Sequence, residues 1–420
     1  MIRLYEEHSE FGAFTKYDTD TGILTHITKC EYDSLKTICD CDSFSGLNSF
    51  LHTNFPRRIY FQITRNCNLN CDYCFIKAES NNNHLNKEII FKIAEYFGRK
   101  GLMEIRLTGG EPTTHPYFKE IHQKFRKENV YVSVATNCIW NNDLLDYLSN
   151  QDDLWIIASI DGGKEIHNKF RCNSYDVVLK NLQTLRKNNP KIRIRLNTVL
   201  TKENRHDLEH LSVLTKELDA ESITLVPLRP QVRDKRVREK MLSPIEFKQV
   251  LEKMLVYKDL YGIKFTTTIE TEYKNSIMKD KIFEKKSSCP AGREGTNLDF
   301  DNINQKFVVY ACSYCPASDL MEKKNIREPF LAGEFSYNDI TEFTTIWNDD
   351  DKWEIFRNLS LKSDNCKKCN ELGKRCTGSC LIQNIDLSSI LENQNVKEEI
   401  KKQMRQNGEW YCYKNIMEQK

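Results

Sequence analysis

The sequence predicts an α/β fold: a partial (β/α)6 barrel, preceded by a short N-terminal arm of a β-hairpin and a helix, and followed by a cysteine-rich domain. The first reason is that strand-like and helix-like stretches alternate six times between residues 56 and 285. Such alternation is typical of a parallel sheet with right-handed crossovers. The second is that most of the 16 cysteines lie before residue 75 or after residue 288. We therefore expect an arm at residues 1–55, a barrel at 56–285 and a C-terminal domain at 286–420.

The composition is that of a globular protein without charge bias. Of its 420 residues, 39% are hydrophobic and 29% are charged, and the net charge is +2. This balance gives no general attraction to nucleic acid or to a membrane surface. No apolar run has membrane-spanning length, and the N-terminus lacks the apolar segment of an export signal. We expect a cytoplasmic location, where clustered cysteines indicate metal ligands rather than disulfides.

The elements of the barrel follow from local patterns along the chain. We expect strands at residues 57–64, 103–108, 130–136, 154–160, 191–199 and 222–226. We expect helices at residues 85–100, 115–128, 144–148, 175–187, 208–218 and 243–261. The last helix begins with a capping box, Ser243-Pro244-Ile245-Glu246. In such a barrel the functional groups belong on loops at the carboxyl ends of the strands.

The loop after the first strand reads Cys67-Asn-Leu-Asn-Cys71-Asp-Tyr-Cys74. Three thiolates on one loop can hold three irons of a cubic iron–sulfur cluster and leave the fourth iron open for chemistry. Zinc is the alternative metal, but a zinc site needs a fourth Cys or a His that this loop does not contain.

Further polar and glycine-rich turns end the next four strands. The second strand is followed by Gly109-Gly110-Glu111, and the third ends in Thr136-Asn137-Cys138. The fourth ends in Ser159-Ile-Asp161-Gly162, and the fifth carries Asn197 near its end. Glycines allow the backbone to approach a ligand closely, whereas each polar residue alone can also be a satisfied turn or cap.

The spacing C-x3-C-x2-C, with Tyr73 before the last Cys, resembles the signature of the radical S-adenosylmethionine (SAM) family. The resemblance implies a 4Fe–4S cluster whose open iron binds S-adenosyl-L-methionine. Gly109, Gly110 and Glu111 then match the motif that binds the amino group of SAM. By the same resemblance Tyr73, Ser159, Asp161 and Asn197 lie near the cofactor. Cys138 stands where relatives usually have glycine, and we expect it to pack in the interior.

The cysteines of the C-terminal domain resemble the SPASM extension of radical SAM enzymes, which houses two auxiliary iron–sulfur clusters, expected to be 4Fe–4S. The implied outer cluster is held by Cys366, Cys369, Cys376 and Cys412. The implied inner cluster is held by Cys289, Cys312 and Cys380, with Cys315 as a fourth ligand; without Cys315, one iron would stay open.

This C-terminal pattern departs from the family pattern in three places. Six residues instead of five separate Cys369 from Cys376, 22 residues separate Cys289 from Cys312, and Phe307 stands where relatives often have glycine. A pair of zinc sites built from the same thiols is the alternative.

Two segments have a substrate-related and a plain structural interpretation. Residues 1–55 resemble a truncated form of the module that binds leader peptides, or they form a packing arm. A basic run follows the sixth strand and either attracts an acidic leader or is a solvated loop, which we favour. The run consists of Arg229, Arg233, Lys235, Arg236, Arg238 and Lys240.

The resemblance implies an enzyme that reductively cleaves SAM to a 5′-deoxyadenosyl radical, which abstracts a hydrogen from a ribosomally made precursor peptide. The expected product is a thioether, ether or carbon–carbon crosslink, and a flavodoxin or ferredoxin is the expected reductant. An anaerobic sulfatase-maturing (formylglycine) enzyme is one alternative. Those relatives carry an Asp that acts as a base next to an inner-cluster cysteine, whereas Ser313 and Pro316 stand at these positions here. A radical SAM dehydrogenase of a small molecule and a zinc-stabilised binding protein are the others. The sequence does not identify a catalytic acid or base.

Overall fold

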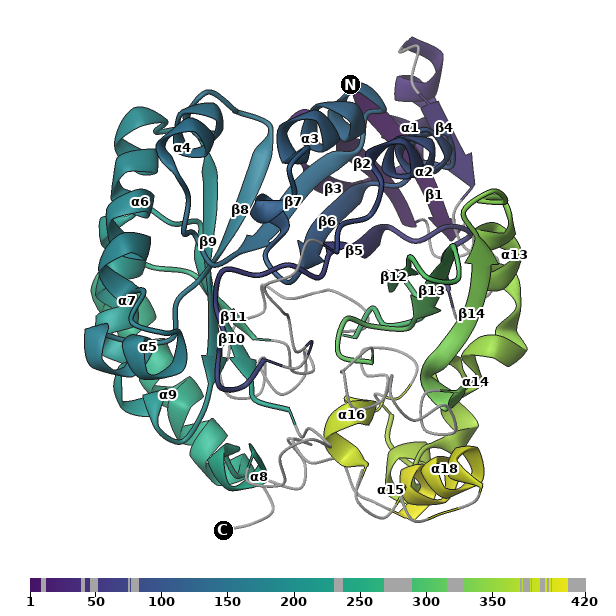
Figure 1. Cartoon of the computed structure of the whole chain (residues 1–420). Helices are drawn as coiled ribbons and strands as arrows, with labels where there is room; N and C mark the ends of the chain where they lie inside the picture. The colour runs from purple at the N-terminus through teal and green to yellow at the C-terminus, as the bar shows by residue number, and fades with distance from the viewer. Residues whose placement is uncertain are drawn as a thin grey trace.

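A ten-stranded sheet forms the frame of the computed structural model, with the strands in the order β11-β10-β9-β8-β7-β6-β5-β12-β13-β14 (Figure 1). The structure describes residues 1–8, 13–38, 42–45, 52–74, 76, 83–229, 237–267, 289–315, 328–370, 372, 378, 380–385, 390, 393 and 395–406. The first seven strands of this order are parallel to their neighbours, as a (β/α) barrel requires. They are β5 (Arg58–Thr64), β6 (Glu104–Gly109), β7 (Tyr131–Thr136), β8 (Leu154–Ser159), β9 (Arg193–Leu200), β10 (Ser222–Pro227) and β11 (Phe265–Thr267).

Helices follow the strands and cover the outer face of the sheet (Figure 1). They are α2 (Lys87–Arg99), α3 (Phe118–Lys127), α4 (Asn142–Ser149), α5 (Lys164–Phe170), α6 (Tyr175–Asn188), α7 (Leu208–Glu217), α8 (Val237–Lys240) and α9 (Pro244–Tyr261). The expected capping box is confirmed: Ser243 Oγ accepts from Glu246 N at 3.3 Å, and Glu246 Oε2 accepts from Ser243 N at 2.8 Å. The six expected strands and six expected helices are all present, and α5, α8 and β11 are elements that the sequence patterns did not indicate.

The alternation of side chains along each strand separates an apolar outer face from a polar interior. In β5, Ile59, Phe61 and Ile63 are fully buried in the core under the helices. The residues between them, Tyr60 and Gln62, point to the interior of the barrel, because successive side chains of a strand face opposite sides. The interior is therefore lined by polar groups on several strands, which is where a site for polar ligands can form.

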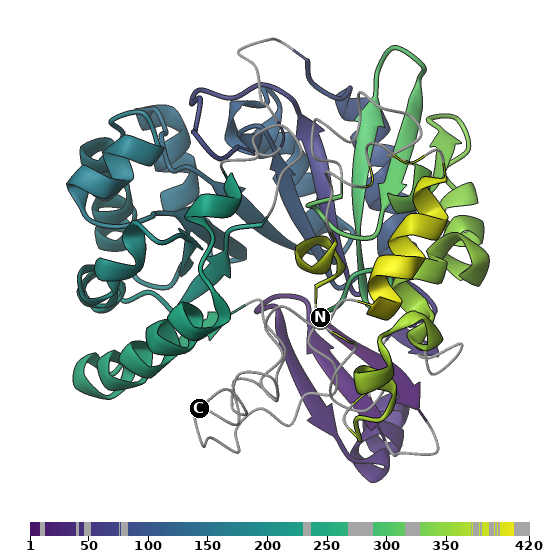
Figure 2. The same ribbon diagram turned by 90° about the horizontal axis from the view of Figure 1, so that it is seen from below.

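The N-terminal segment is a four-stranded sheet, β3-β2-β1-β4, with one helix. Its strands can be followed in purple in Figure 2. The elements are β1 (Ile2–His8), β2 (Ala13–Asp18), β3 (Ile23–Ile27), α1 (Lys29–Ile38) and β4 (Asp42–Ser45). The hydroxyls of Tyr5 and Tyr17 donate to the carbonyls of Gly101 at 2.8 Å and Met103 at 3.0 Å. These contacts place the sheet at the amino end of the barrel strands, away from the Cys67 loop.

The C-terminal part extends the barrel sheet. Strand β12 (Gly295–Asp301) pairs in parallel with β5, and β13 (Lys306–Tyr310) and β14 (Leu331–Ser336) continue as antiparallel strands. The helices are α13 (Glu342–Asn348), α14 (Glu354–Arg357), α15 (Asp364–Lys367), α16 (Leu381–Asn384) and α18 (Val396–Gln406). Short 3-10 helices are η2 (Pro112–Thr114), η3 (Asn204–His206), η4 (Glu328–Phe330), η5 (Asp350–Trp353) and η6 (Leu359–Leu361).

One hydrophobic core runs through the barrel and the C-terminal part. The division into residues 1–55, 56–285 and 286–420 therefore stays a prediction, since sheet and core are continuous across its second boundary. Among the described residues, no helix has both the length and the apolar character needed to cross a membrane.

Candidate functional site

The three cysteines of the first motif lie on the loop that leaves the carboxyl end of β5. Cys74 N donates to Cys71 O at 3.1 Å, and Leu69 N donates to Cys67 Sγ at 3.4 Å. Burial raises the pKa of Cys67 to about 12 and that of Cys71 to about 11. Buried thiols of this kind become thiolates when a metal replaces the proton. Within the described part of the chain, no three Cys, His, Asp or Glu side chains are already gathered as a metal site.

The two glycines of the second motif hold this loop against β6. Gly110 N donates to Thr64 O at 2.9 Å, and Glu111 N donates to Asn66 O at 2.8 Å. A Cβ on Gly109 would lie 2.2 Å from Thr64 O, and a Cβ on Gly110 would lie 2.2 Å from Asn66 O. Gly109 also has a φ of +142°, which L side chains rarely adopt. Both positions therefore require glycine, because the backbone of the cysteine loop runs directly over them.

The carboxylate of Glu111 is 2% exposed and points into the same site. One oxygen accepts from Thr113 N at 3.1 Å and from Thr113 Oγ1 at 2.6 Å. The other accepts from Asn137 N at 2.7 Å, and burial raises the pKa of the carboxyl group. The Thr136 side chain also donates to this carboxylate, which is therefore held by two side chains and two backbone N–H groups. Contact with the amino group of SAM stays a prediction.

The end of β7 is tied to the cysteine loop by a hydrogen bond from Asn137 Nδ2 to Asn68 Oδ1 at 2.6 Å. Cys138 follows with a φ of +61° in the left-handed region, which explains why glycine suits this position. Its side chain is fully buried, so the expectation that it packs in the interior is confirmed.

Asp161 connects three segments of the site. Its buried carboxylate accepts from the Tyr73 hydroxyl, from Arg171 Nε at 2.5 Å and from Val199 N at 2.8 Å. Because Tyr73 lies within the cysteine loop, Asp161 and Arg171 position that loop over the ends of β8 and β9. Arg171 is thus a structural residue that supports Asp161, and the role of Asp161 beside the cofactor stays a prediction.

Ser159 and Asn197 lie next to each other across β8 and β9. Asn197 Oδ1 is buried and has no hydrogen-bond partner in the structure. A buried acceptor without a donor is rare in folded proteins and indicates a polar group that a ligand or water supplies. Together with three thiols on one loop, this unsatisfied acceptor fits a cluster with SAM.

A second group of cysteines lies where β13 ends. Cys312 Sγ and Cys315 Sγ are 3.5 Å apart, and Arg229 Nε donates to Cys380 Sγ at 3.5 Å. The hydrogen bond with Cys315 lowers the pKa of Cys312 to about 7, whereas burial raises that of Cys315. Cys289 is half-buried and packs against the same core. Cys380 and Cys312 thus both interact with the Arg229 guanidinium, and Cys315 lies beside Cys312.

The expected outer-cluster cysteines are only partly described. Cys366 and Cys369 lie at α15, where Cys369 N donates to Cys366 O at 2.9 Å. Cys376 and Cys412 lie outside the described residues.

Arg229 corrects the interpretation of the basic run as a solvated loop. It is 8% exposed, and its guanidinium stacks on Tyr314 at 4.0 Å. The reason is that Arg229 comes two residues after the end of β10 and reaches the C-terminal cysteine Cys380, which sequence spacing did not reveal. Lys240 stays partly exposed near Asp72, at 3.9 Å, whereas Arg233, Lys235 and Arg236 lie outside the described residues.

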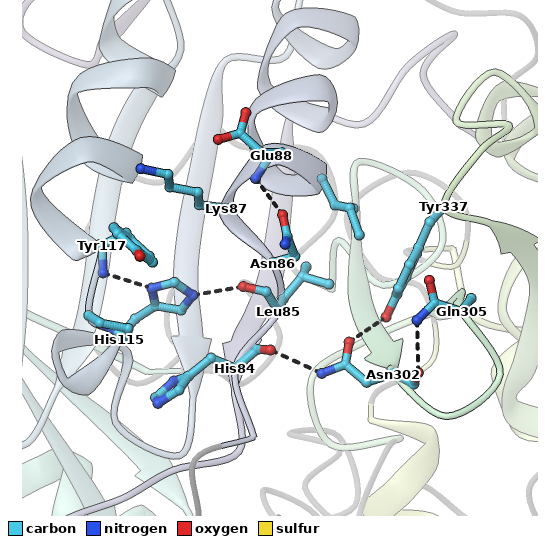
Figure 3. A pocket seen from close by; sticks show the side chains of 12 residues that line it. His84, Leu85, Asn86, Lys87, Glu88, His115, Tyr117, Asn302, Gln305 and Tyr337 are labelled. Atoms are coloured by element: carbon cyan, nitrogen blue, oxygen red, sulfur yellow. Dashed lines mark hydrogen bonds between the residues drawn. The ribbon is translucent and has the colours of Figure 1, made fainter.

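A pocket of about 520 Å³ lies between the starts of α2 and α3 and the β12–β13 turn (Figure 3). Its polar groups bond to one another: His115 with Leu85 O at 2.9 Å, and Asn302 with His84 O at 3.0 Å and Tyr337 at 3.1 Å. The bond from Asn302 to His84 O joins the C-terminal hairpin to the barrel. Because its polar groups are used in these bonds, we assign the pocket to the packing between barrel and hairpin and do not treat it as a candidate site.

Comparisons with known proteins agree with this geometry. The family model described as the Radical SAM superfamily matches residues 61–214. The AdoMet-dependent heme synthase of Methanosarcina barkeri is 26% identical over 344 residues, which cover 78% of this chain and 91% of that protein. A cysteine-type anaerobic sulfatase-maturating enzyme of Clostridium perfringens is 23% identical over 338 residues, with 75% and 85% covered.

The crystal structure of Streptococcus suis SuiB bound to the precursor peptide SuiA matches with a TM-score of 0.68 at 13% identity, covering 94% of this chain and 96% of that one. At this identity the likeness shows the fold, and it confirms the predicted combination of a barrel with a cysteine-rich C-terminal part. SuiB has also been solved with S-adenosylmethionine.

Proposed function

Because residues 61–214 match the Radical SAM superfamily, we propose that the chain is a radical SAM enzyme, a maturase that crosslinks a ribosomally made peptide. The predicted cofactors, a 4Fe–4S cluster with S-adenosyl-L-methionine and auxiliary clusters, are those of such maturases. When bound, the cluster and SAM supply a 5′-deoxyadenosyl radical that removes a hydrogen atom from the substrate. The product would be a thioether, ether or carbon–carbon bond.

The observation that carries this proposal is the likeness to SuiB along almost the whole of both chains, because SuiB was solved with a precursor peptide. A likeness restricted to the barrel would leave any radical SAM substrate open, since one fold supports many reactions. Here it also includes the C-terminal part that holds Cys312, Cys315 and Cys380 beside Arg229.

The residues of this chain would then have distinct tasks. Cys67, Cys71 and Cys74 would hold the cluster, with the loop fixed by the two glycines and by the bond from Tyr73 to Asp161. Glu111 would accept from the amino group of SAM, while Ser159 and Asn197 would contact its other polar groups. The barrel walls would keep water away from the reacting atoms. A flavodoxin or ferredoxin is the proposed electron donor.

The assignment of the C-terminal cysteines belongs to the same proposal. Cys366, Cys369, Cys376 and Cys412 would hold the outer cluster. Cys289, Cys312, Cys315 and Cys380 would hold the inner one. Two distances support the inner set: 3.5 Å between Cys312 Sγ and Cys315 Sγ, and 3.5 Å between Arg229 Nε and Cys380 Sγ.

A formylglycine-forming enzyme is the second candidate, because the matched relatives include sulfatase-maturating enzymes. Those relatives carry an Asp beside an inner-cluster cysteine, whereas Ser313 and Pro316 stand here. Peptide crosslinking is therefore the first proposal.

Mass spectrometry separates the two. Reconstituted enzyme, SAM and reductant are incubated with peptides encoded beside the gene and, separately, with a cysteine-containing sulfatase peptide. Crosslinking removes two hydrogen atoms from a neighbouring peptide and keeps its sulfur, whereas formylglycine formation removes the sulfur of the cysteine. A Cys67→Ala variant is the control without cluster. Modification of the sulfatase peptide alone would contradict the crosslinking proposal.

A further inference from the structure

The interior of the barrel contains more positive than negative charge. Arg58 and Arg106 share one carboxylate: Arg58 Nε lies 2.7 Å from one oxygen of Glu104, and Arg106 Nη2 lies 2.8 Å from the other. The Ser133 hydroxyl donates to the same carboxylate at 2.5 Å. Arg58 Nη2 also lies 2.5 Å from the oxygen that Arg58 Nε contacts. About four acceptor positions of Glu104 are thus all used, and none is left for a third cation.

That third cation is Arg195. It lies on β9 and stacks on the indole of Trp155 at 4.5 Å. Its Nε is buried without a hydrogen-bond acceptor, and Arg195 forms no ion pair with any residue in the described part of the chain. Burial, together with the charges of Arg106 and Arg58, lowers its pKa to about 9. The surroundings therefore disfavour this positive charge, and an anion placed beside it would relieve the repulsion.

Other groups in the interior of the barrel also lack hydrogen-bond partners. Gln62 Nε2 and Trp155 Nε1 are buried and have no acceptor in the structure. Thr108 Oγ1 is also buried and has no hydrogen-bond partner. Gln62 and Thr108 pair across β5 and β6, and the alternation of each strand turns them to the same interior as Arg195. Buried donors without acceptors are costly, so a ligand rich in acceptor atoms fits here.

The position of Arg195 relates this group to the expected SAM site. Arg195 precedes Asn197 by two residues on β9, so it faces the same interior one step further from the carboxyl end of the strand. A group bound at Arg195 would therefore lie deeper in the barrel than the Ser159–Asn197 pair.

We propose that the interior of the barrel binds a carboxylate of the substrate, with Arg195 as its counter-ion. The inference rests on the proposed function for the identity of the ligand: an Asp or Glu side chain, or the C-terminus, of the substrate peptide. The carboxylate of SAM could occupy the same position beside Arg195, and the experiment distinguishes it from a carboxylate of the substrate.

The test is equilibrium dialysis of radiolabelled acetate against the anaerobically reconstituted enzyme at constant ionic strength, with and without saturating SAM. The wild type is expected to bind acetate saturably, about one per chain, and to keep that site when SAM is bound. Arg195→Gln should weaken acetate binding at least about tenfold, because a charge-assisted pair is lost, whereas Arg195→Lys should retain most of it. SAM affinity should not change in either variant.

Arg193→Gln is the matched control. Arg193 stacks on the same Trp155 ring at 4.4 Å, but Glu221 already pairs with it at 3.0 Å. Acetate affinity should therefore stay within about twofold of the wild type. Equal loss in both variants would mean that the guanidiniums only support Trp155, and would overturn the proposal.

Two further results would also overturn it: no saturable acetate binding, or displacement of acetate by SAM together with weaker SAM binding in Arg195→Gln. Because dialysis needs no turnover, acetate binding without any peptide modification would refute the proposed function alone.

Discussion

Replacing Gly110 by alanine tests whether the glycine motif holds the cysteine loop in place. The added Cβ would lie 2.2 Å from Asn66 O, whereas ordinary contact begins at 3.4 Å, so the loop must shift by about 1 Å. Asn66 directly precedes Cys67, and the shift would break the 2.8 Å bond from Glu111 N. Overpacking of this kind costs about 1–3 kcal/mol and a lost hydrogen bond about 1 kcal/mol more. We expect a free energy of unfolding lower by about 2–4 kcal/mol.

The assay combines urea unfolding of the apoprotein with iron content after anaerobic reconstitution. Gly110→Ala should lose iron of the first cluster in addition to stability. Gly262→Ala is the matched control: Gly262 also has a positive φ, +68°, but no atom lies within 4 Å of an added Cβ. It should lose about 1–2 kcal/mol of stability and no iron. Wild-type iron content in Gly110→Ala, or equal iron loss in both variants, would refute the reasoning.

Three further predictions concern the surroundings of the site. Asp161→Ala should lower the free energy of unfolding by about 3–5 kcal/mol, measured in urea, because it leaves the buried Arg171 without its 2.5 Å partner. Cys138→Ala should keep the full iron content, by chemical analysis, because this buried thiol packs rather than ligates. Burial lowers the pKa of His167 to about 4, so the unfolded chain binds the proton more tightly. Stability should then fall as pH drops from about 6.5 to 4, by up to about 1.4 kcal/mol per pH unit, and His167→Gln should flatten this slope.

Each of these has a distinct contrary result. A stable Asp161→Ala variant would show that Arg171 finds another acceptor. Loss of iron in Cys138→Ala would make that cysteine a ligand. A stability that rises on acidification, or the same slope in His167→Gln, would contradict the assignment of a neutral histidine that accepts from Asp161 N at 3.3 Å.

Much of the barrel was predictable because its elements are local. Hydrophobic periodicity and the Ser243 capping box locate strands and helices within a few residues, and the Cys67 loop and Gly109-Gly110 turn have fixed spacings. Strand β1 was not predicted because its charged residues interrupt the hydrophobic pattern of a strand. Arg3 is nevertheless buried, since its guanidinium donates to the carbonyls of Leu102 at 2.9 Å and Gly98 at 3.0 Å.

The rest depends on contacts between distant parts of the chain. The pairing of β12 with β5 joins residues more than two hundred positions apart, and no local pattern specifies it. In the sequence Arg229 is one of six cations in a basic run, and nothing there indicates that its guanidinium reaches Cys380 Sγ at 3.5 Å. In the sequence Arg195 is one of the polar residues that alternate with apolar ones along a strand. Only the pairing of Glu104 with Arg58 and Arg106 in the structure shows that Arg195 lacks a counter-ion.

The central claim is our proposal that this chain, whose residues 61–214 match the Radical SAM superfamily, holds three separate iron–sulfur clusters. We would measure iron and sulfide per chain after anaerobic reconstitution, in the wild type and in the variant with Cys67, Cys71 and Cys74 all changed to alanine. The account predicts about twelve irons in the wild type and about eight in the variant. About four irons in the wild type and none in the variant, with zinc bound by the C-terminal cysteines, would contradict the auxiliary clusters.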